Sequence, residues 1–332
     1  MAKNKVLEIT DLVTRFFTKE GTVHAVNGVS FSIYEGEIFG LVGESGCGKS
    51  VTCKSIINLL HPPGQIVSGS IKYAGQELVG VDENALSDIR GREIGMIFQE
   101  PLTALNPVLT IREQIFDALE KKGMTSGEKY ARAAELLTLA GIPAPVERME
   151  EYPHQFSGGM RQRVMIAIAL ASEPKILLAD EPTTALDVTI QDQILKLIDQ
   201  LREELGMAVL FVTHDLGVVA QLCDRVAVMY AGYIMELTAT LTLFAAPRHP
   251  YTHALLQSLP SDIPRGHPLE SIGGQPPDLF ELPPGCPFSP RCRMAEGRCF
   301  ESLPPLTELL PGHFVRCHRS GETENFRGII DL

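Results

Sequence analysis

The sequence contains no long hydrophobic run. A membrane-spanning helix needs about 18 or more consecutive apolar residues, and no stretch reaches that length. The N-terminal sequence MAKNKVLEIT also lacks the apolar segment and small-residue cleavage site of a signal peptide. We therefore expect no transmembrane helix, and we expect the chain to work in the cytosol, where thiols stay reduced.

Basic residues are also few. The 332 residues include 29 lysines and arginines against 41 aspartates and glutamates, which gives a formal net charge of -12. Nucleic-acid binding usually shows as a basic patch, so this balance argues against nucleic acid as the main partner. No internal repeat or low-complexity tract is present. The length suggests about two domains, and the hydrophobic fraction of 44% predicts a packed globular protein.

Short apolar strands alternate with helices over the first 240 residues. Buried strands are predicted at KILLAD (175–180), MAVLFVTH (207–214) and RVAVMY (225–230), and an amphipathic helix is predicted at residues 189–206. This alternation predicts an α/β fold whose parallel sheet is covered on both faces. From about residue 240, proline and glycine become frequent, and one further helix is predicted within residues 246–260.

The strongest motif is GESGCGKS, at residues 43–50. It matches the phosphate-binding pattern G-x-x-x-x-G-K-[ST] and lies between a predicted strand and a predicted helix. Glycines let backbone N–H groups turn toward phosphate oxygens, and the helix N-terminus adds the positive end of its dipole. Lys49 is placed to reach the β- and γ-phosphates, and Ser50 to offer a hydroxyl to Mg²⁺. The predicted ATP-binding residues of this loop are Gly43, Glu44, Ser45, Gly46, Cys47, Gly48, Lys49, Ser50 and Val51.

A second chemical motif, Asp180 and Glu181, lies at the end of the predicted strand KILLAD. Asp180 ends this strand and is placed to hold Mg²⁺, and Glu181 follows, placed to polarise a water molecule for attack on the γ-phosphate. Enzymes with a phosphate loop divide the work in this way among the loop, a metal-binding carboxylate and a group that orients water. The two motifs together predict ATP hydrolysis.

The stretch FSGGMRQRVMIAIAL (156–170) opens a long predicted helix. Ser157 can cap this helix, and Gly158 and Gly159 let a phosphate approach its N-terminus. Taken together with the phosphate loop and the Asp-Glu motif, FSGGM resembles the signature of the ATP-binding cassette (ABC) family, the ATPase subunits of ABC transporters. It departs from the commonest form, LSGGQ, at Phe156 and at Met160, and the second change removes a polar side chain.

The resemblance covers about residues 5–240 and implies further site residues. Gln99 in IFQEP resembles the Q-loop glutamine, and His214 in VTHD resembles the switch histidine that contacts the γ-phosphate. Asp187 ends TALD, which resembles the D-loop that crosses to the partner cassette. Phe16 falls where the family places an aromatic ring on adenine. The resemblance thus implies Glu181, His214 and Gln99 as catalytic residues, and Ser50, Gln99 and Asp180 as Mg²⁺ ligands.

The resemblance also implies the fold and the assembly. The expected fold is an α/β P-loop NTPase cassette, with a RecA-like core and a helical subdomain inserted at residues 101–172. The cassette would occupy residues 1–240, and a small irregular C-terminal extension residues 241–332. In this family the signature faces the ATP of the other subunit, so the resemblance implies a heterodimer with a paralogous ATPase, or a homodimer in isolation.

The segment RHPYTHALLQSLP (248–260) is similar to the one that follows the cassette in oligopeptide and dipeptide importer ATPases, above all their D-type subunits. This likeness implies a peripheral protein on the cytoplasmic face of the cell membrane. It would energise two permease subunits fed by an extracytoplasmic peptide-binding protein. An importer ATPase for nickel or another small solute is the alternative. A non-transport ABC ATPase and a redox-sensing regulator fit less well, because a single phosphate loop and complete catalytic motifs are present.

Four cysteines gather near the C-terminus, Cys286, Cys292, Cys299 and Cys317, with the spacing C-x5-C-x6-C-x17-C. In a cytosolic chain such a set indicates metal ligands, and four sulfurs suit zinc or an iron–sulfur cluster. Unligated thiols are a third reading. Importer ATPases of this group carry a similar CPF-x-PRC tail, which implies a 4Fe–4S cluster. His313 and His318 could each replace a zinc ligand, but we expect both to be solvated.

Overall fold

The computed structural model describes residues 4–120, 123–183, 186–259, 272–326 and 328–329. The chain forms two compact units, each assembled from separate stretches of sequence. Unit 1 consists of Met1–Val6, Ile33–Glu37 and Gly80–Val212. Unit 2 consists of Leu7–Ser32, Ile38–Val79 and Thr213–Leu332. The sequence boundary expected at residue 240 is not tested by this division and stays a prediction.

Three parallel strands form the centre of unit 1. They are β6 (Ile94–Ile97), β7 (Ile176–Asp180) and β8 (Ala208–Thr213), in the order β8-β7-β6. Both neighbouring pairs are parallel, and every residue of β7 and β8 is buried. Strands buried on both faces read as continuous apolar runs, which is why the sequence pattern found them.

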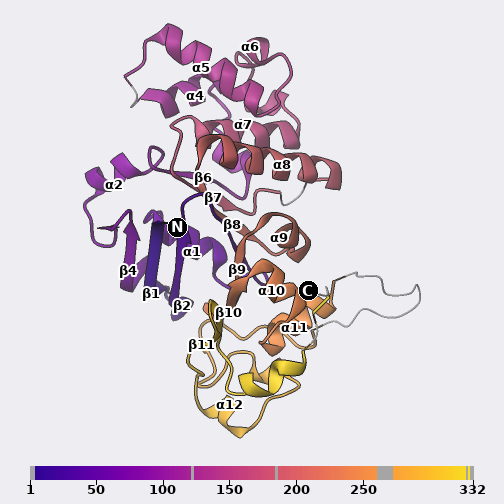
Figure 1. The fold of residues 1–332 in the computed structure, drawn as a ribbon. Helices are drawn as coiled ribbons and strands as arrows, with labels where there is room; N and C mark the ends of the chain where they lie inside the picture. The colour runs from indigo at the N-terminus through magenta and orange to yellow at the C-terminus, as the bar shows by residue number, and fades with distance from the viewer. Residues whose placement is uncertain (1–3, 121–122, 184–185, 260–271, 327, 330–332) are drawn as a thin grey trace. The chain divides into compact units, whose positions relative to one another are not determined.

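Helices fill the rest of unit 1. Those between residues 101 and 172 pack on one another: α4 contacts α5, and α7 contacts α3, α4 and α5 (Figure 1). Capping boxes at Thr110 and Thr125 set the starts of α4 and α5. The helices of unit 1 are α2 (Glu83–Ile89), α3 (Pro101–Ala104), α4 (Ile111–Leu119), α5 (Ser126–Leu139), α6 (Pro145–Arg148), η2 (Pro153–Gln155), α7 (Gly158–Leu170) and α8 (Val188–Leu205).

Unit 2 contains an antiparallel sheet that the sequence pattern did not predict. Its order is β2-β1-β4-β5, and β4 pairs antiparallel with both β1 and β5. The strands are β1 (Lys5–Phe17), β2 (Thr22–Tyr34), β4 (Gly64–Tyr73) and β5 (Gln76–Glu77). The expectation of one parallel sheet was therefore incomplete, because the first strands of the chain belong to this separate layer.

A second set of strands in unit 2 has the order β11-β12-β10-β9-β3. Strands β3 and β9 are parallel, and the other pairs are antiparallel. The strands are β3 (Ile38–Val42), β9 (Arg225–Tyr230), β10 (Tyr233–Ala239), β11 (Thr307–Leu310) and β12 (His313–Val315). The C-terminal extension, expected to be irregular, thus adds two strands to this sheet through β10.

Three helices of unit 2 pack on these strands: α9 contacts β3, and α10 and α11 contact β10. The helices of unit 2 are α1 (Lys49–Ile56), α9 (Leu216–Leu222), α10 (Thr240–Ala245), α11 (Pro250–Gln257), η3 (Ser289–Arg291), α12 (Gly297–Glu301) and η4 (Ser320–Asn325). Among the helices of the described residues, none has both the length and the apolar character needed to cross a bilayer.

The extension is anchored on Glu236, a fully buried carboxylate in β10. Its oxygens accept from the backbone N–H groups of Arg248 (2.7 Å) and His249 (2.9 Å), and His313 Nε2 lies 2.7 Å away. The expectation that His313 is solvated was wrong, because β12 pairs with β10 and brings the ring to this carboxylate. Burial lowers the pKa of His249 to about 4, so its ring stays neutral and its Nδ1 accepts from the N–H of Tyr251.

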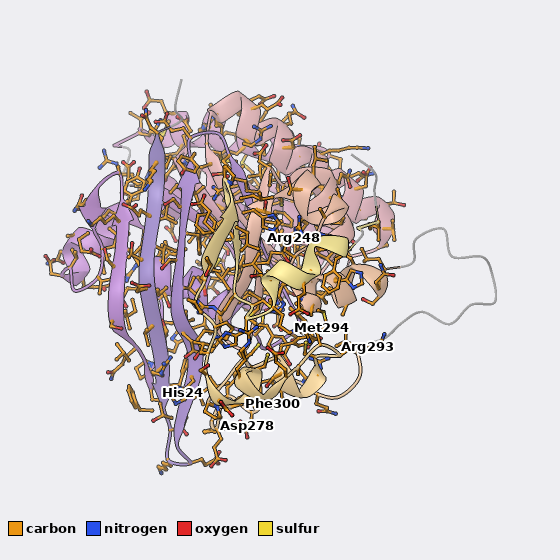
Figure 2. All side chains as sticks on the ribbon, turned by 60° about the horizontal axis from the view of Figure 1, so that its bottom comes forward. His24, Arg248, Asp278, Arg293, Met294 and Phe300 are labelled. Carbon is orange, nitrogen blue, oxygen red and sulfur yellow. The ribbon has the colours of Figure 1, made fainter. Side chains whose placement is uncertain are left out.

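The extension also reaches β2. The N–H of His24 donates to the carbonyl of Leu279 at 2.9 Å, and Figure 2 shows His24 near Asp278 at this end of unit 2. Phe280 lies against Gly21, where an added Cβ would stand 3.2 Å from the ring. The extension is therefore held at both β2 and β10, through different stretches of its sequence.

Candidate functional site

The loop 43–50 joins β3 to α1 in unit 2, as the motif predicts. Two of its glycines are required by close backbone approaches. A Cβ at Gly43 would lie 2.1 Å from the carbonyl oxygen of Met229, and one at Gly48 would lie 2.3 Å from that of Ala25. Gly48 also has φ 105°, a conformation that side chains other than glycine rarely adopt.

Lys49 is buried inside this loop. Its Nζ donates to the carbonyl oxygens of Gly43 (2.9 Å) and Glu44 (3.0 Å). Helix α1 starts at Lys49 without a side-chain cap, and Ser50 and Val51 lie in its first turn. A cation beside an uncapped helix N-terminus is an arrangement that suits phosphate.

In unit 1 the structure brings Gln99 to the predicted carboxylate of Glu181. The Nε2 of Gln99 donates to Oε2 of Glu181 at 3.1 Å, and Asp180 is the buried last residue of β7. Glu181 itself has φ 47°, in the left-handed region, and its N–H donates to the carbonyl of Val212. Strained backbone of this kind in a residue other than glycine is concentrated at functional sites.

The signature and D-loop residues cap two helices of unit 1. Ser157 caps α7 by accepting from the N–H of Met160 at 3.3 Å, a bond that does not depend on the side chain at residue 160. Asp187 caps α8 through the N–H of Ile190 at 2.9 Å. Gly158 is exposed, and Gly159 faces Ile190, whose Cγ2 lies 2.8 Å from where a Cβ would stand. Residues 184–185 of the D-loop motif lie outside the described residues.

Phe16 and His214 belong to unit 2. Phe16 is half-buried in β1, paired with Gly64, where an added Cβ would lie 2.6 Å from its ring. Its neighbour Phe17 is 49% exposed. His214 is exposed and directly follows β8. Their predicted contacts with adenine and the γ-phosphate remain predictions.

The four C-terminal cysteines line one cavity of unit 2, together with Phe288, Met294 and Pro304 among others. All four thiols are free. Burial raises the pKa of Cys286 to about 12 and that of Cys317 to about 11, and it also raises that of Cys292. Within the described residues, no three histidine, cysteine, aspartate or glutamate side chains are grouped closely enough to hold a metal ion.

Sequence reasoning missed the residues that join this extension to the phosphate loop. They are Arg291 of the CPFSPRC stretch and the tyrosines Tyr230 and Tyr251. The one available signal was the position of Arg291 between two of the four cysteines.

A phosphate loop between a strand and a helix, a buried strand ending in Asp-Glu, and a capped FSGG helix define a P-loop ATPase of the cassette type. A family model described as "ABC transporter" matches residues 26–184, and one described as "Oligopeptide/dipeptide transporter, C-terminal region" matches residues 235–299. The chain belongs to the family of ABC transporter ATP-binding proteins. The predicted fold class, ATP binding and ATPase activity are thereby confirmed.

Similar proteins cover nearly the whole chain. The dipeptide transport ATP-binding protein DppD of Bacillus subtilis (strain 168) is 50% identical over 315 residues, 94% of each chain. The oligopeptide transport ATP-binding protein OppD of Salmonella typhimurium (strain LT2) is 45% identical over 320 residues, 96% of this chain and 95% of that relative. A solved dimeric structure of the ATP-binding cassette MJ0796, bound to ADP and Pi, has a TM-score of 0.64 and 32% identity, and covers 70% of this chain and 98% of that chain.

Proposed function

We propose that this chain is the ATP-hydrolysing subunit of an importer for dipeptides and oligopeptides. The observation that carries the proposal is the full-length likeness to peptide transport ATP-binding proteins, which includes the extension and not the cassette alone. A non-transport ABC ATPase or a redox regulator has no such support. The division into a cassette (1–240, with helical subdomain 101–172) and an extension (241–332) belongs to the same proposal.

The proposed roles of the site residues follow from their chemistry. Lys49 and the N–H groups of the loop bind the phosphates of ATP, and Phe16 stacks on its adenine. Ser50, Gln99 and Asp180 would hold Mg²⁺, which supplies positive charge to the phosphates when bound. Glu181 accepts a hydrogen bond from the attacking water, and its own bond from Gln99 orients its carboxylate. His214 would contact the γ-phosphate. The ATP bound by the partner subunit would be contacted by four residues, Ser157, Gly158, Gly159 and Asp187.

The proposed setting is the cytoplasmic face of the cell membrane. There the chain pairs with a paralogous ATPase, or with its own copy in isolation, and binds two permease subunits served by an extracytoplasmic peptide-binding protein. The solved MJ0796 cassette is dimeric, which supports pairing as the working state. We propose no nucleic-acid partner for this chain.

The cargo is tested by which loaded binding protein stimulates ATP hydrolysis. We expect the reconstituted transporter to hydrolyse ATP several-fold faster when its binding protein carries a dipeptide or oligopeptide. Nickel-loaded binding protein is the matched comparison. Stimulation by nickel and not by any member of a peptide panel would contradict the peptide proposal and favour the alternative of a metal importer.

We propose further that Cys286, Cys292, Cys299 and Cys317 hold a 4Fe–4S cluster. All four thiols line one cavity of unit 2, where four sulfur ligands could share one metal centre. Zinc holds each sulfur at about 2.3 Å, which requires tightly grouped ligands. Structural zinc sites usually include a short pair such as C-x2-C, which this tail lacks, and the loops of five and six residues between its first three cysteines suit a larger cluster better. Bound, the cluster would crosslink the extension and could exchange electrons.

Anaerobic purification tests the cluster. We expect a brown protein with iron and acid-labile sulfide in roughly equal amounts, and we expect Cys292→Ser to lose most of both. Cys223→Ser is the control, because Cys223 is a buried cysteine of unit 2 that does not line the cavity. A colourless protein with one zinc per chain would overturn the cluster in favour of zinc, and a metal-free protein would favour unligated thiols.

A further inference from the structure

The extension makes a direct ionic contact with the phosphate loop. Arg291 lies in η3, between Cys286 and Cys292, and its guanidinium forms a two-pronged bond with the carboxylate of Glu44. The distances are 2.8 Å from Nη1 to Oε2 and 3.1 Å from Nη2 to Oε1. A paired, planar contact of this kind is strong and directional.

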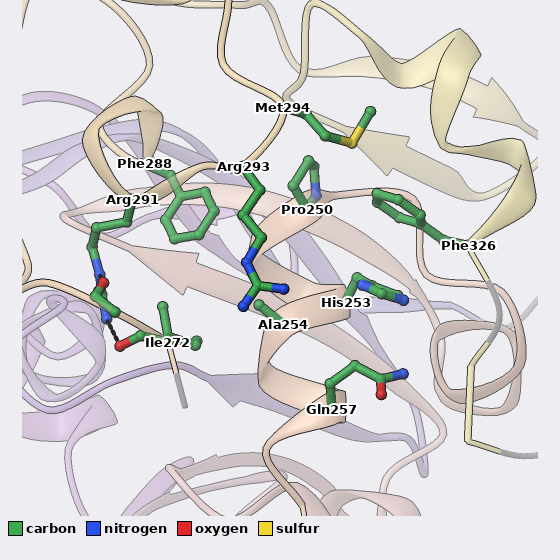
Figure 3. A pocket seen from close by; sticks show the side chains of 11 residues that line it. Pro250, His253, Ala254, Gln257, Ile272, Phe288, Arg291, Arg293, Met294 and Phe326 are labelled. Atoms are coloured by element: carbon green, nitrogen blue, oxygen red, sulfur yellow. Dashed lines mark hydrogen bonds between the residues drawn. The ribbon is translucent and has the colours of Figure 1, made fainter. Parts of the chain in front are cut away.

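The guanidinium of Arg291 has several further hydrogen-bond partners. Its Nη1 also donates to the hydroxyl of Tyr230 at 3.1 Å, and its Nε donates to the carbonyl of Gly273 at 3.0 Å. Figure 3 shows the further bond from Arg291 to the carbonyl of Ile272, at the edge of a cavity of unit 2. The Arg291 side chain is only 6% exposed, and its guanidinium lies 6.0 Å from the ring centre of Phe288. Arg291 therefore cannot leave Glu44 without breaking several other bonds.

A second bond from the extension reaches the same loop residue. The backbone N–H of Glu44 donates to the hydroxyl of Tyr251, in α11, at 3.1 Å. Tyr251 is fully buried and its ring contacts those of Tyr230 and Phe288. The backbone of Glu44 is thus fixed by Tyr251 and its side chain by Arg291, and both of these residues belong to the extension.

The charge of Glu44 makes this contact important for nucleotide binding. A carboxylate, 24% exposed, sits in a loop whose ligand is a polyanion, and the carbonyl of the same residue holds Lys49. Unpaired, that carboxylate would repel the phosphates and leave the loop less fixed. Arg291 neutralises it from outside the cassette motifs.

We propose that Arg291 is a positioning residue for the phosphate loop, through which the four-cysteine extension sets the affinity of the chain for ATP. The inference rests on the proposed ATP-binding role of residues 43–51. It assigns to the extension a part in ATP binding, in addition to any metal centre that it holds.

The test measures binding of a fluorescent ATP analogue and the kinetics of ATP hydrolysis with the purified full-length chain. We expect Arg291→Met to raise the Kd and KM for nucleotide about tenfold, with kcat within about twofold, which corresponds to about 1.4 kcal/mol of binding. Arg291→Lys keeps the positive charge but loses the two-pronged geometry, so we expect its nucleotide affinity to lie between those of the wild type and Arg291→Met. The double variant Arg291→Met with Glu44→Gln recovers affinity to within about threefold of the wild type, because the repelling charge is gone.

Controls separate this effect from folding and from the role of the loop. Arg298→Met removes a half-exposed arginine of the extension, bonded to Glu296 and the carbonyl of His318, and should leave affinity unchanged. Wild-type affinity in Arg291→Met, or a loss that Glu44→Gln does not relieve, would overturn the inference. If thermal melting shows that Arg291→Met is unfolded, equal nucleotide affinities of the wild type and Arg291→Lys would overturn the inference. Normal binding by Lys49→Ala would instead refute the assignment of the loop itself.

Discussion

Replacing Glu181 with glutamine slows ATP hydrolysis by about 10²–10⁴-fold, the usual loss for a positioned general base. Glutamine keeps the size of the side chain and an oxygen that can accept from Gln99, so the local structure persists. It removes the negative charge that polarises the attacking water. ATP binding is expected to stay intact, because the proposed phosphate contacts come from residues 43–51. Steady-state turnover and equilibrium binding of a fluorescent ATP analogue check the two halves of this expectation.

A matched control exists in the same unit. Glu147 is an exposed glutamate in α6, and Glu147→Gln should hydrolyse ATP at the wild-type rate. Undiminished turnover in Glu181→Gln would contradict the assignment of Glu181 as the residue that polarises the attacking water. Loss of ATP binding together with turnover would show that this residue serves the nucleotide site in another way.

Lys49→Ala is expected to weaken ATP binding by about 10²-fold or more, because each hydrogen bond to a charged group contributes about 1.5–3 kcal/mol. In the structure the ammonium group is buried and held by the carbonyls of Gly43 and Glu44, so it is fixed within the loop that receives the phosphates. Alanine leaves the loop without its cation. Titration with a fluorescent ATP analogue at fixed Mg²⁺ and salt measures the loss.

Lys54→Ala supplies the comparison for this variant. Lys54 lies in the last turn of the same helix, α1, away from the N-terminal end that receives the phosphates, and its removal should change affinity by less than about twofold because salt screens charges over distance. Equal affinities of Lys49→Ala and wild type would contradict the phosphate-loop assignment. A melting temperature lowered in both variants alike would indicate a general effect on α1 in place of a lost phosphate contact.

The parts of the fold that could be predicted depend on local sequence. The phosphate loop is a continuous motif, and β7 and β8 read as unbroken apolar runs because they are buried on both faces. The fold class and the presence of helices between residues 101 and 172 followed from the same signals and from the family resemblance.

The parts that could not be predicted depend on pairing between distant residues. The antiparallel sheet requires β1 to find β4, and no local pattern states that register. His313 was expected in solvent because its partner, Glu236, is 77 residues away. Arg291 and Glu44 are 247 residues apart, so no local pattern around this arginine predicted its contact with the phosphate loop.

Uptake of labelled peptide into sealed vesicles tests the proposed function most directly. The vesicles contain the two permeases, the partner ATPase and this chain, with the peptide-binding protein supplied on the opposite side. We predict uptake that requires both ATP and this chain and that falls sharply when Glu181→Gln replaces the wild type. Peptide uptake that proceeds at the same rate without this chain, or without ATP, would contradict the proposal.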